Sequence, residues 1–318
     1  MHAVGIKALG GPEQLKLMEV EEPRPGRFDV VIRVAAASVN RLDLEFSRNG
    51  GPDDQPAFPA ILGCDGSGVI SSVGVLAIGF HVGDPVIFAA CPMTAGHGAY
   101  AEYVAVPSNQ VALKAPGLDW AMAAAMPLAA LAACQAVDRL MPEPGETVLV
   151  NGASGGVGSF AVQLIRMRGA RVIANARVSA WPACRELGAE DCVDGRSEDL
   201  VPALHAILPS GVDAVLDLVD GATQVDSSGG MRRGSRLVTL LSVHQKPVFK
   251  DRRVTAWSMH AKPNTPELSG LSRLLDAGRL LMPKVERFAM GEAAEAHARL
   301  DAGGVLGKLV LMTRGFLQ

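Results

Sequence analysis

A glycine-rich turn near the middle of the chain constrains the fold more than any other feature of the sequence. It lies between a short apolar run, Thr147 to Val150, and a helical pattern of apolar residues from Phe160 to Ile165. Its glycines, Gly152, Gly155 and Gly158, allow a tight turn and close approach to a ligand, and the helix after them offers free N–H groups to an anion. The spacing is one residue longer than GxGxxG, and no GK[ST] follows, which argues against a nucleotide-triphosphatase loop.

This turn has two interpretations, a dinucleotide-binding loop or a mere tight connection between a strand and a helix. The strand before it, the helix after it and a second apolar run, Arg171 to Ala174, favour the dinucleotide-binding loop. We therefore expect a diphosphate to lie against the start of the helix near Gly158. The predicted contacts in this loop are Ser154, Gly155, Gly156, Val157 and Gly158.

The end of the second apolar run predicts which dinucleotide binds. Folds that prefer NAD usually carry an acidic residue there, about 20 residues after the glycines, to hold the ribose hydroxyls. Residues 175–179 contain no acid, and Arg177 suits the adenosine 2′-phosphate of NADPH; the alternative is a solvated loop arginine. The sequence therefore predicts NADPH. The other cofactor contacts predicted in the second half of the chain are Asn175, Arg177, Ser179, Leu218, Leu240 and Leu241.

The chain has two regions with different sequence patterns. The first third alternates short apolar runs with Gly and Pro, which predicts short strands separated by turns. After residue 117, Ala-rich helical stretches alternate with β-branched runs, which predicts a parallel sheet with helices on both faces. This pattern ends at residues 262–266, where we place a domain boundary. The tail predicts helices at Pro266 to Ala277 and Gly291 to Leu300, and a last strand from Lys308 to Met312.

Length and composition limit the class of protein. A chain of 318 residues with 48% hydrophobic residues predicts about two folded domains, and a net charge of -3 without charged blocks argues against nucleic acid as a partner. The longest apolar run, Trp120 to Cys134, contains Pro127 and is shorter than the about 20 residues of a membrane span, so it predicts a buried helix. Five cysteines without a CxxC pair, and no secretory signal, predict reduced thiols and a cytoplasmic protein.

Seven landmarks, in order along nearly the whole chain, carry a family resemblance. They are Ser38-Val39-Asn40 with Asp43, Gly63-Cys64-Asp65-Gly66-Ser67-Gly68-Val69, Val82-Gly83-Asp84-Pro85-Val86, Gly98-Ala99-Tyr100-Ala101-Glu102-Tyr103-Val104, the loop from Asn151 to Gln163, Arg185-Glu186-Leu187-Gly188-Ala189, and Gly307-Lys308-Leu309-Val310-Leu311. With these motifs the chain resembles the medium-chain dehydrogenase/reductase superfamily, in its zinc-independent quinone oxidoreductase branch, which includes the zeta-crystallin-like enzymes.

The resemblance implies an α/β protein of two domains. A GroES-like, β-rich catalytic domain would comprise residues 1–120 and 264–318, and a Rossmann domain with a doubly wound parallel sheet would comprise residues 121–263 and bind NADPH. Family members transfer hydride to quinones or related conjugated carbonyls and usually form homodimers, and no membrane partner is expected. Asn40 matches an asparagine near the nicotinamide, and Gly307 and Lys308 match a tail segment that closes over the cofactor. Pro127 completes the expected cofactor contacts.

Departures from the family pattern concern the chemistry. Relatives often have a tyrosine shortly after the position of Asn40, whereas this chain has Leu44, Glu45 and Phe46 there. Glu45 would act as an acid only if burial raised its pKa; as a surface carboxylate it would have no role. Zinc-dependent relatives have cysteine at the position of Asn40 and Gly-His-Glu at residues 63–65, so we expect no metal in this chain.

Three functions stay open on this basis. The favoured one is an NADPH-dependent quinone reductase, because the oxygens of a reduced quinone can take protons from water and need little acid catalysis. A reductase of enone or enoyl-thioester double bonds is the second, and it would require a placed proton donor. The third is an NADPH-binding redox sensor or structural protein with little turnover.

Overall fold

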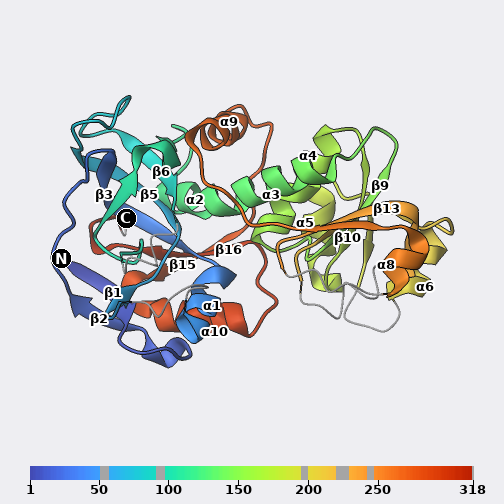
Figure 1. Ribbon diagram of the computed structural model, residues 1–318, viewed down its shortest axis with the longest axis horizontal. Helices are drawn as coiled ribbons and strands as arrows, with labels where there is room; N and C mark the ends of the chain where they lie inside the picture. The colour runs from blue at the N-terminus through green and yellow to red at the C-terminus, as the bar shows by residue number, and fades with distance from the viewer. Residues whose placement is uncertain (51–56, 91–96, 195–199, 220–228, 242–246, 317–318) are drawn as a thin grey trace. The chain divides into compact units, whose positions relative to one another are not determined.

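The computed structural model describes residues 1–50, 57–90, 97–194, 200–219, 229–241 and 247–316. The chain forms two compact units, of which the first contains residues 1–128 and 263–318 and the second contains residues 129–262 (Figure 1). The predicted division placed residues 121–128 in the dinucleotide-binding domain. In the structure, α2 (Trp120–Ala125) instead packs against β3 (Asp29–Val39) and β5 (Asp65–Val73) of the first unit, because its alanines allow close approach to these strands.

A seven-stranded sheet, built from both ends of the chain, forms the frame of the first unit. Its strands follow the order β15-β16-β3-β5-β6-β8, and β7 also pairs with β3. Strand β16 (Lys308–Met312) is antiparallel to β3, with Leu309 opposite Val39. The other strands are β6 (Pro85–Ala89), β7 (Tyr103–Pro107), β8 (Val111–Leu113) and β15 (Val285–Ala289). This register brings the late residue Lys308 beside the end of β3.

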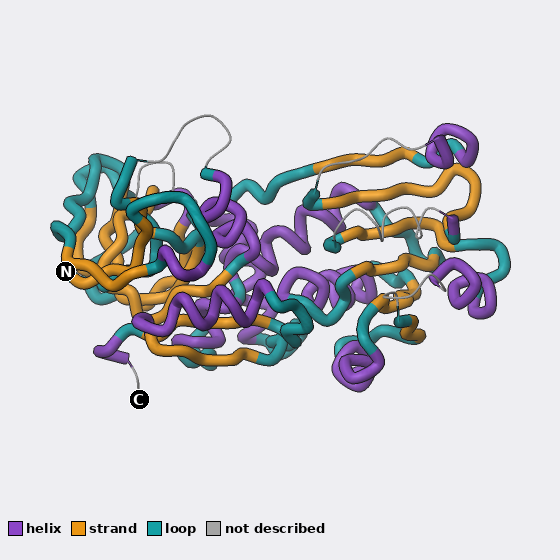
Figure 2. Tube along the Cα trace, turned by 90° about the horizontal axis from the view of Figure 1, so that it is seen from below, coloured by secondary structure: helices purple, strands orange, loops and turns teal. Residues whose placement is uncertain are grey.

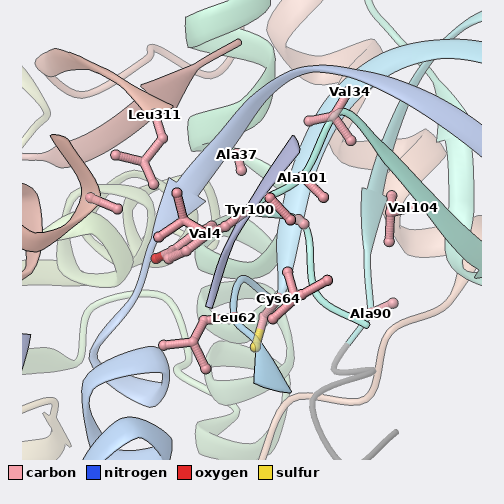
Figure 3. Close-up of a cluster of buried hydrophobic side chains, with 14 of the residues drawn as sticks. Val4, Val34, Ala37, Leu62, Cys64, Ala90, Tyr100, Ala101, Val104 and Leu311 are labelled. Carbon is pink, nitrogen blue, oxygen red and sulfur yellow. The ribbon is translucent and has the colours of Figure 1, made fainter. Parts of the chain in front are cut away.

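A second, three-stranded sheet and three helices complete the first unit. The small sheet has the order β2-β1-β4, from β2 (Lys16–Glu19), β1 (His2–Ile6) and β4 (Ala60–Ile61). Helix α1 (Arg41–Asn49) contacts α10 (Ala293–Asp301) (Figure 1), and α9 (Thr265–Asp276) contacts β8. The core lies between these elements and includes the fully buried ring of Tyr100, with Leu62 and Cys64 among its neighbours in the same cluster (Figure 3).

A six-stranded parallel sheet forms the second unit. Its order is β11-β10-β9-β12-β13-β14, which is the arrangement of a doubly wound dinucleotide-binding fold and confirms the predicted fold class. The strands are β9 (Thr147–Asn151), β10 (Arg171–Asn175), β11 (Asp191–Val193), β12 (Val212–Asp217), β13 (Met231–Thr239) and β14 (Thr255–Ser258). The helices that contact these strands are α4 (Gly156–Met167) against β9 and β10, α5 (Trp181–Glu186) and α6 (Leu200–Ile207) against β11, and α8 (Pro247–Arg252) against β13 (Figure 1). Figure 2 shows the same chain with helices in purple and strands in orange.

The apolar run from Trp120 to Cys134 forms two helices, so the prediction of one buried helix was wrong. Helix α2 ends at Ala125, and α3 (Pro127–Leu140) begins with the proline. Pro127 has no N–H to continue the hydrogen bonds of α2, but it is well suited to the first position of a new helix. Among the helices of the described residues, none combines the length and the apolar character that a membrane crossing requires.

Candidate functional site

The carboxyl ends of four neighbouring strands of the second unit meet at one edge of the parallel sheet. Ligands of open α/β sheets bind at this edge, beyond the carboxyl ends of the strands. Every cofactor contact predicted in the second unit follows one of these strands. They are Ser154 to Gly158 after β9, Asn175, Arg177 and Ser179 at the end of β10, Leu218 after β12, and Leu240 and Leu241 after β13.

The glycine loop connects β9 to α4 with a backbone geometry suited to an anion. Gly155 is the N-cap of α4, and its lack of a side chain leaves the first-turn N–H groups uncapped. A Cβ on Gly158 would stand 2.2 Å from the Gly152 carbonyl oxygen, so this position requires glycine for the helix to pack against the loop. Among the described residues, a Cβ on Gly155 would meet only that same oxygen, at an ordinary 3.4 Å. Gly158 therefore serves packing, while Gly155 borders space that a diphosphate can occupy.

A buried polar chain ties three strand ends together beneath this loop. Asn175 Nδ2 donates to Asn151 Oδ1 at 3.0 Å, and Asn151 Nδ2 donates to Asp217 Oδ1 at 3.3 Å. The Asn175 carbonyl also accepts hydrogen bonds from the N–H groups of Gly152 and Ala153, at 3.1 and 3.2 Å. The side chain at the end of β10 is therefore turned inward, toward β9, and supports the loop.

Arg177 and Ser179 lie in the turn that follows β10. Both are exposed, and Arg177 is the N-cap of a short 3-10 helix, Val178–Ala180. The turn is fixed from below by Trp181, whose indole N–H donates to the Ala176 carbonyl at 3.0 Å. Arg177 is thus an exposed residue at the same sheet edge as the glycine loop, where the sequence predicts the 2′-phosphate.

The first unit contains a separate cluster, formed by Lys308, Asn40 and Asp65. Lys308 Nζ donates to Asn40 Oδ1 at 2.5 Å and to the Val39 carbonyl at 3.1 Å. Asn40 Nδ2 donates to Asp65 Oδ1 at 2.8 Å. These bonds determine the orientation of the Asn40 amide, because its oxygen faces a cation and its nitrogen faces a carboxylate. Burial lowers the pKa of Lys308, although the carboxylates of Asp65 and Asp43 oppose this shift.

The surroundings of this cluster hold Asp65 and Lys308 in place. Asp65 is fully buried and also accepts from Ser38 Oγ at 2.7 Å and from the Leu128 N–H at 2.9 Å. Gly307 adopts a φ of +81°, and a Cβ there would lie 2.1 Å from the Lys284 carbonyl oxygen. Glycine is therefore required immediately before Lys308. Pro127, adjacent to Leu128, is itself buried.

A second group of buried polar residues lies beside this cluster. Asp43 accepts from the N–H groups of Asn40 and Gly63, at 2.7 and 3.2 Å, and from the Tyr100 hydroxyl at 3.2 Å. The Tyr100 oxygen is 3.0 Å from His297 Nε2. Burial raises the pKa of Asp43 to about 6 and lowers that of His297 to about 4, and it also raises the pKa of Tyr100.

Glu45 does not meet the condition set for an acid role. It lies on the exposed face of α1, whereas its helix neighbours Leu44 and Phe46 are buried. In the described ranges of the chain, no three side chains of His, Cys, Asp and Glu gather closely enough to hold a metal ion. The buried thiols of Cys184 and Cys192 form no disulfide within the described residues, and Cys91 falls outside those residues.

Asp43, Asp65 and His297 have no role that the sequence alone predicts. The two aspartates stand within family landmarks, but nothing local shows that they share one buried network. His297 had a usable signal, because Ala293, Ala296 and His297 follow the spacing of one helix face, and that face is buried. A histidine on an apolar helix face must find a polar partner in the core.

The fold and the glycine loop define a two-domain oxidoreductase with a dinucleotide-binding sheet. Residues 26–117 match the family described as alcohol dehydrogenase GroES-like domain, and residues 187–311 match the family described as zinc-binding dehydrogenase. The quinone oxidoreductase of Coxiella burnetii is 30% identical, with a TM-score of 0.89 over 99% of both chains. This chain belongs to the medium-chain dehydrogenase/reductase superfamily, in its zinc-independent branch together with quinone oxidoreductases.

Two further relatives extend the comparison. Human mitochondrial NAD(P)H oxidoreductase RTN4IP1 is 28% identical over 89% of this chain and 81% of the relative. The quinone oxidoreductase of Escherichia coli, solved in complex with NADPH, has the same fold, with a TM-score of 0.89 at 22% identity over 98% of this chain and all 100% of that one. The protein is accordingly an oxidoreductase of a family that binds NAD(P).

Proposed function

We propose that this protein is an NADPH-dependent quinone reductase that acts by direct hydride transfer. The observation that carries the proposal is the edge of the parallel sheet, where the uncapped start of α4 and the exposed Arg177 follow adjacent strands. The first offers N–H groups to a diphosphate, and the second offers a guanidinium to a 2′-phosphate. Asn175 has its side chain engaged with Asn151, so it is not arranged to hold ribose hydroxyls as an acid would.

NADPH, when bound, supplies the hydride, and a quinone takes it up with one proton to give the hydroquinone and NADP⁺. The N–H groups of α4 would hold the diphosphate, with Ser154, Gly156 and Val157 in the surrounding loop. In the first unit, Asn40 and Lys308 are proposed to contact the nicotinamide end. Their contribution is orientation, because their mutual hydrogen bond fixes the amide and the ammonium before any ligand binds.

Proton delivery needs no side chain in this scheme. A reduced quinone oxygen is basic enough to collect a proton from water, so the exposed position of Glu45 is compatible with quinone reduction. Reduction of an enone would require a donor aimed at the α-carbon. This difference in proton demand is what favours quinones over conjugated carbonyls as the small-molecule substrate.

The test is consumption of NADPH by the purified protein. We expect turnover with 1,4-benzoquinone and 9,10-phenanthrenequinone, and much slower turnover with a panel of enones. Faster enone reduction would favour the second function, and tight NADPH binding without turnover on either panel would favour the sensor. Binding of neither NADPH nor NADH would refute the redox assignment.

Arg177→Ala tests the cofactor preference. Loss of a charge-assisted contact should weaken NADPH by about 1 to 3 kcal/mol and leave NADH nearly unchanged. The matched control is Arg233→Ala, an exposed arginine near the amino end of β13, which should change neither affinity. Equal weakening of both coenzymes by Arg177→Ala would remove the phosphate assignment.

Two remaining proposals concern assembly and location. A homodimer through the second unit is supported by the family resemblance, and β14 is the outermost strand of its sheet on the β13 side. Light scattering on a sizing column should then give twice the mass of one chain. A cytoplasmic location is supported by Cys184 and Cys192, whose thiols form no disulfide within the described residues.

A further inference from the structure

A chain of three buried side chains connects α10 to the start of α1. His297 on α10 is 1% exposed, and Tyr100 and Asp43 are fully buried. The Tyr100 oxygen is 3.0 Å from His297 Nε2 and 3.2 Å from Asp43 Oδ2. The Tyr100 and His297 rings also pack edge to face, with centroids 5.7 Å apart. Figure 3 shows the Tyr100 ring among buried apolar side chains, so these three polar residues lie partly within the hydrophobic core.

The number of protons fixes the direction of these hydrogen bonds. The Tyr100 hydroxyl has one hydrogen, which it donates to Asp43 Oδ2. His297 must therefore donate its Nε2 hydrogen to the Tyr100 oxygen, which requires the neutral Nε2–H tautomer. Burial lowers the pKa of His297 to about 4, so the ring is neutral near pH 7. The hydrogen bonds thus run from His297 to Tyr100 and from Tyr100 to the carboxylate of Asp43.

Asp43 uses this support to hold two separate segments of backbone. Its Oδ2 accepts from the Asn40 N–H at 2.7 Å, and its Oδ1 accepts from the Gly63 N–H at 3.2 Å. Asn40 carries the amide proposed to contact the nicotinamide. Gly63 leads within two residues to Asp65, the carboxylate that accepts from that amide. One buried carboxylate therefore fixes both the Asn40 backbone and the segment that carries its side-chain partner.

Burial of the Asp43 carboxylate costs free energy, which points to a role other than stability. The pKa of Asp43 is raised to about 6, chiefly by burial and further by Asp65, while the Asn40 N–H, Lys308 and the Tyr100 hydroxyl act in the opposite direction. A buried charged group is often replaceable by apolar residues without loss of stability. The charged and titratable groups that face these three side chains are Asp65, Lys308 and Cys64, with Arg48 and Asp301 near His297.

We propose that Asp43 is a positioning residue for Asn40, and that Tyr100 and His297 act through it by keeping its carboxylate in place. The proposal rests on the proposed function, which places Asn40 at the nicotinamide end of the cofactor. It predicts that productive geometry requires the ionised carboxylate. Activity should therefore rise with pH as Asp43 loses its proton, and it should fall on the acidic side.

Tyr100→Phe is the decisive variant, because it removes one oxygen and keeps the ring that fills the core. Without the hydroxyl the carboxylate loses a donor, so the pH at which kcat/KM for NADPH reaches half its maximum should rise by about one unit. Above about pH 8, where Asp43 is ionised in both proteins, the values should agree within about threefold. Tyr103→Phe is the matched control, since Tyr103 is the one other tyrosine of the chain and lies half-buried in β7, and it should leave the profile unchanged.

Asp43→Asn is a second test of the proposal. The acid-side step should disappear, and above about pH 8 kcat/KM should be about tenfold or more below that of the wild type, because an amide cannot accept from all three donors. If this variant does not fold, Tyr100→Phe alone decides. If Tyr100→Phe and the wild type reach half-maximal kcat/KM at the same acidic pH, the proposal is overturned. This holds even if the variant melts at a lower temperature, because a purely structural role would change stability alone.

Failure of the proposed function would be visible separately. In that case the wild-type protein would not reduce quinones at any pH. The same comparison would then be made on the NADPH dissociation constant, measured by coenzyme fluorescence across the same pH range. An upward shift of its acid limb in Tyr100→Phe supports the positioning role, and identical limbs in the two proteins overturn it.

Discussion

The buried imidazole of His297 should make this protein measurably sensitive to acid. Burial lowers the pKa of His297 from 6.5 to about 4, so the unfolded chain binds a proton in this interval that the folded protein does not. Unfolding is therefore favoured as the pH falls from about 6.5 to about 4. We predict that His297→Gln, which cannot titrate, removes this loss while a polar side chain still faces the Tyr100 hydroxyl.

The magnitude follows from the size of the shift. Each unit of pKa difference corresponds to about 1.4 kcal/mol, so the full effect approaches about 3 kcal/mol, and about 2 kcal/mol of it should develop between pH 7 and about pH 4.5. Urea unfolding of both proteins at several pH values gives the difference in unfolding free energy. On acidification, the unfolding free energy of the variant minus that of the wild type should increase by about 2 kcal/mol.

The comparison between variant and wild type matters because Asp43 acts in the opposite direction. Its pKa is raised from 3.8 to about 6, so its contribution to stability falls as the pH rises through this range. Asp43 is present in both proteins, and its contribution cancels in the difference. His205→Gln, at an exposed histidine of α6, is the control and should show a flat difference. A flat difference for His297→Gln as well would show that the buried ring is not held neutral, and the donor order assigned to Tyr100 would be wrong.

Other substitutions test the packing and charge of the two candidate sites. Gly158→Ala should destabilise the second unit by about 1 to 3 kcal/mol in urea unfolding, because its Cβ would meet backbone at 2.2 Å, whereas Gly155→Val should unfold normally yet fail to bind NADPH in calorimetry. Unchanged affinity in Gly155→Val would mean that the loop is only a turn. Lys308→Met should cost about 3 kcal/mol of stability, since two buried carboxylates lose their cation, while Lys16→Met on exposed β2 should cost little; equal effects would contradict the cluster.

The sequence predicts the second unit well because its signals are local. The strand, the glycine turn and the helix around Gly155 follow one another directly, and the order of parallel strands then follows from general rules of connection. The strand Lys308–Met312 is also predicted with its observed bounds, because it is a short apolar run that follows glycine residues. The single helix predicted from residue 120 does not form, because Pro127 within the apolar run ends one helix and begins the next.

The polar clusters of the first unit could not be derived in this way. Lys308 and Asn40 are 268 residues apart, and Tyr100 and His297 are 197 residues apart. Only the pairing of β16 with β3 brings the first pair together, and only the packing of α10 brings the second. Family resemblance singled out Asn40 and Lys308 without showing that they bind each other. Burial, which gives Asp43 its altered pKa, is a property of the folded core and has no local pattern in the sequence.

The pairing of β16 with β3 also sets the order of events during synthesis. A growing chain can complete the parallel sheet of the second unit once residue 258 has left the ribosome, but the ammonium that orients Asn40 arrives fifty residues later. Until then Asp65 and Asp43 share the interior without their cation. Incomplete chains would therefore lack the cation of this cluster, and the proposed capacity for redox chemistry would appear only with one of the last strands to be made.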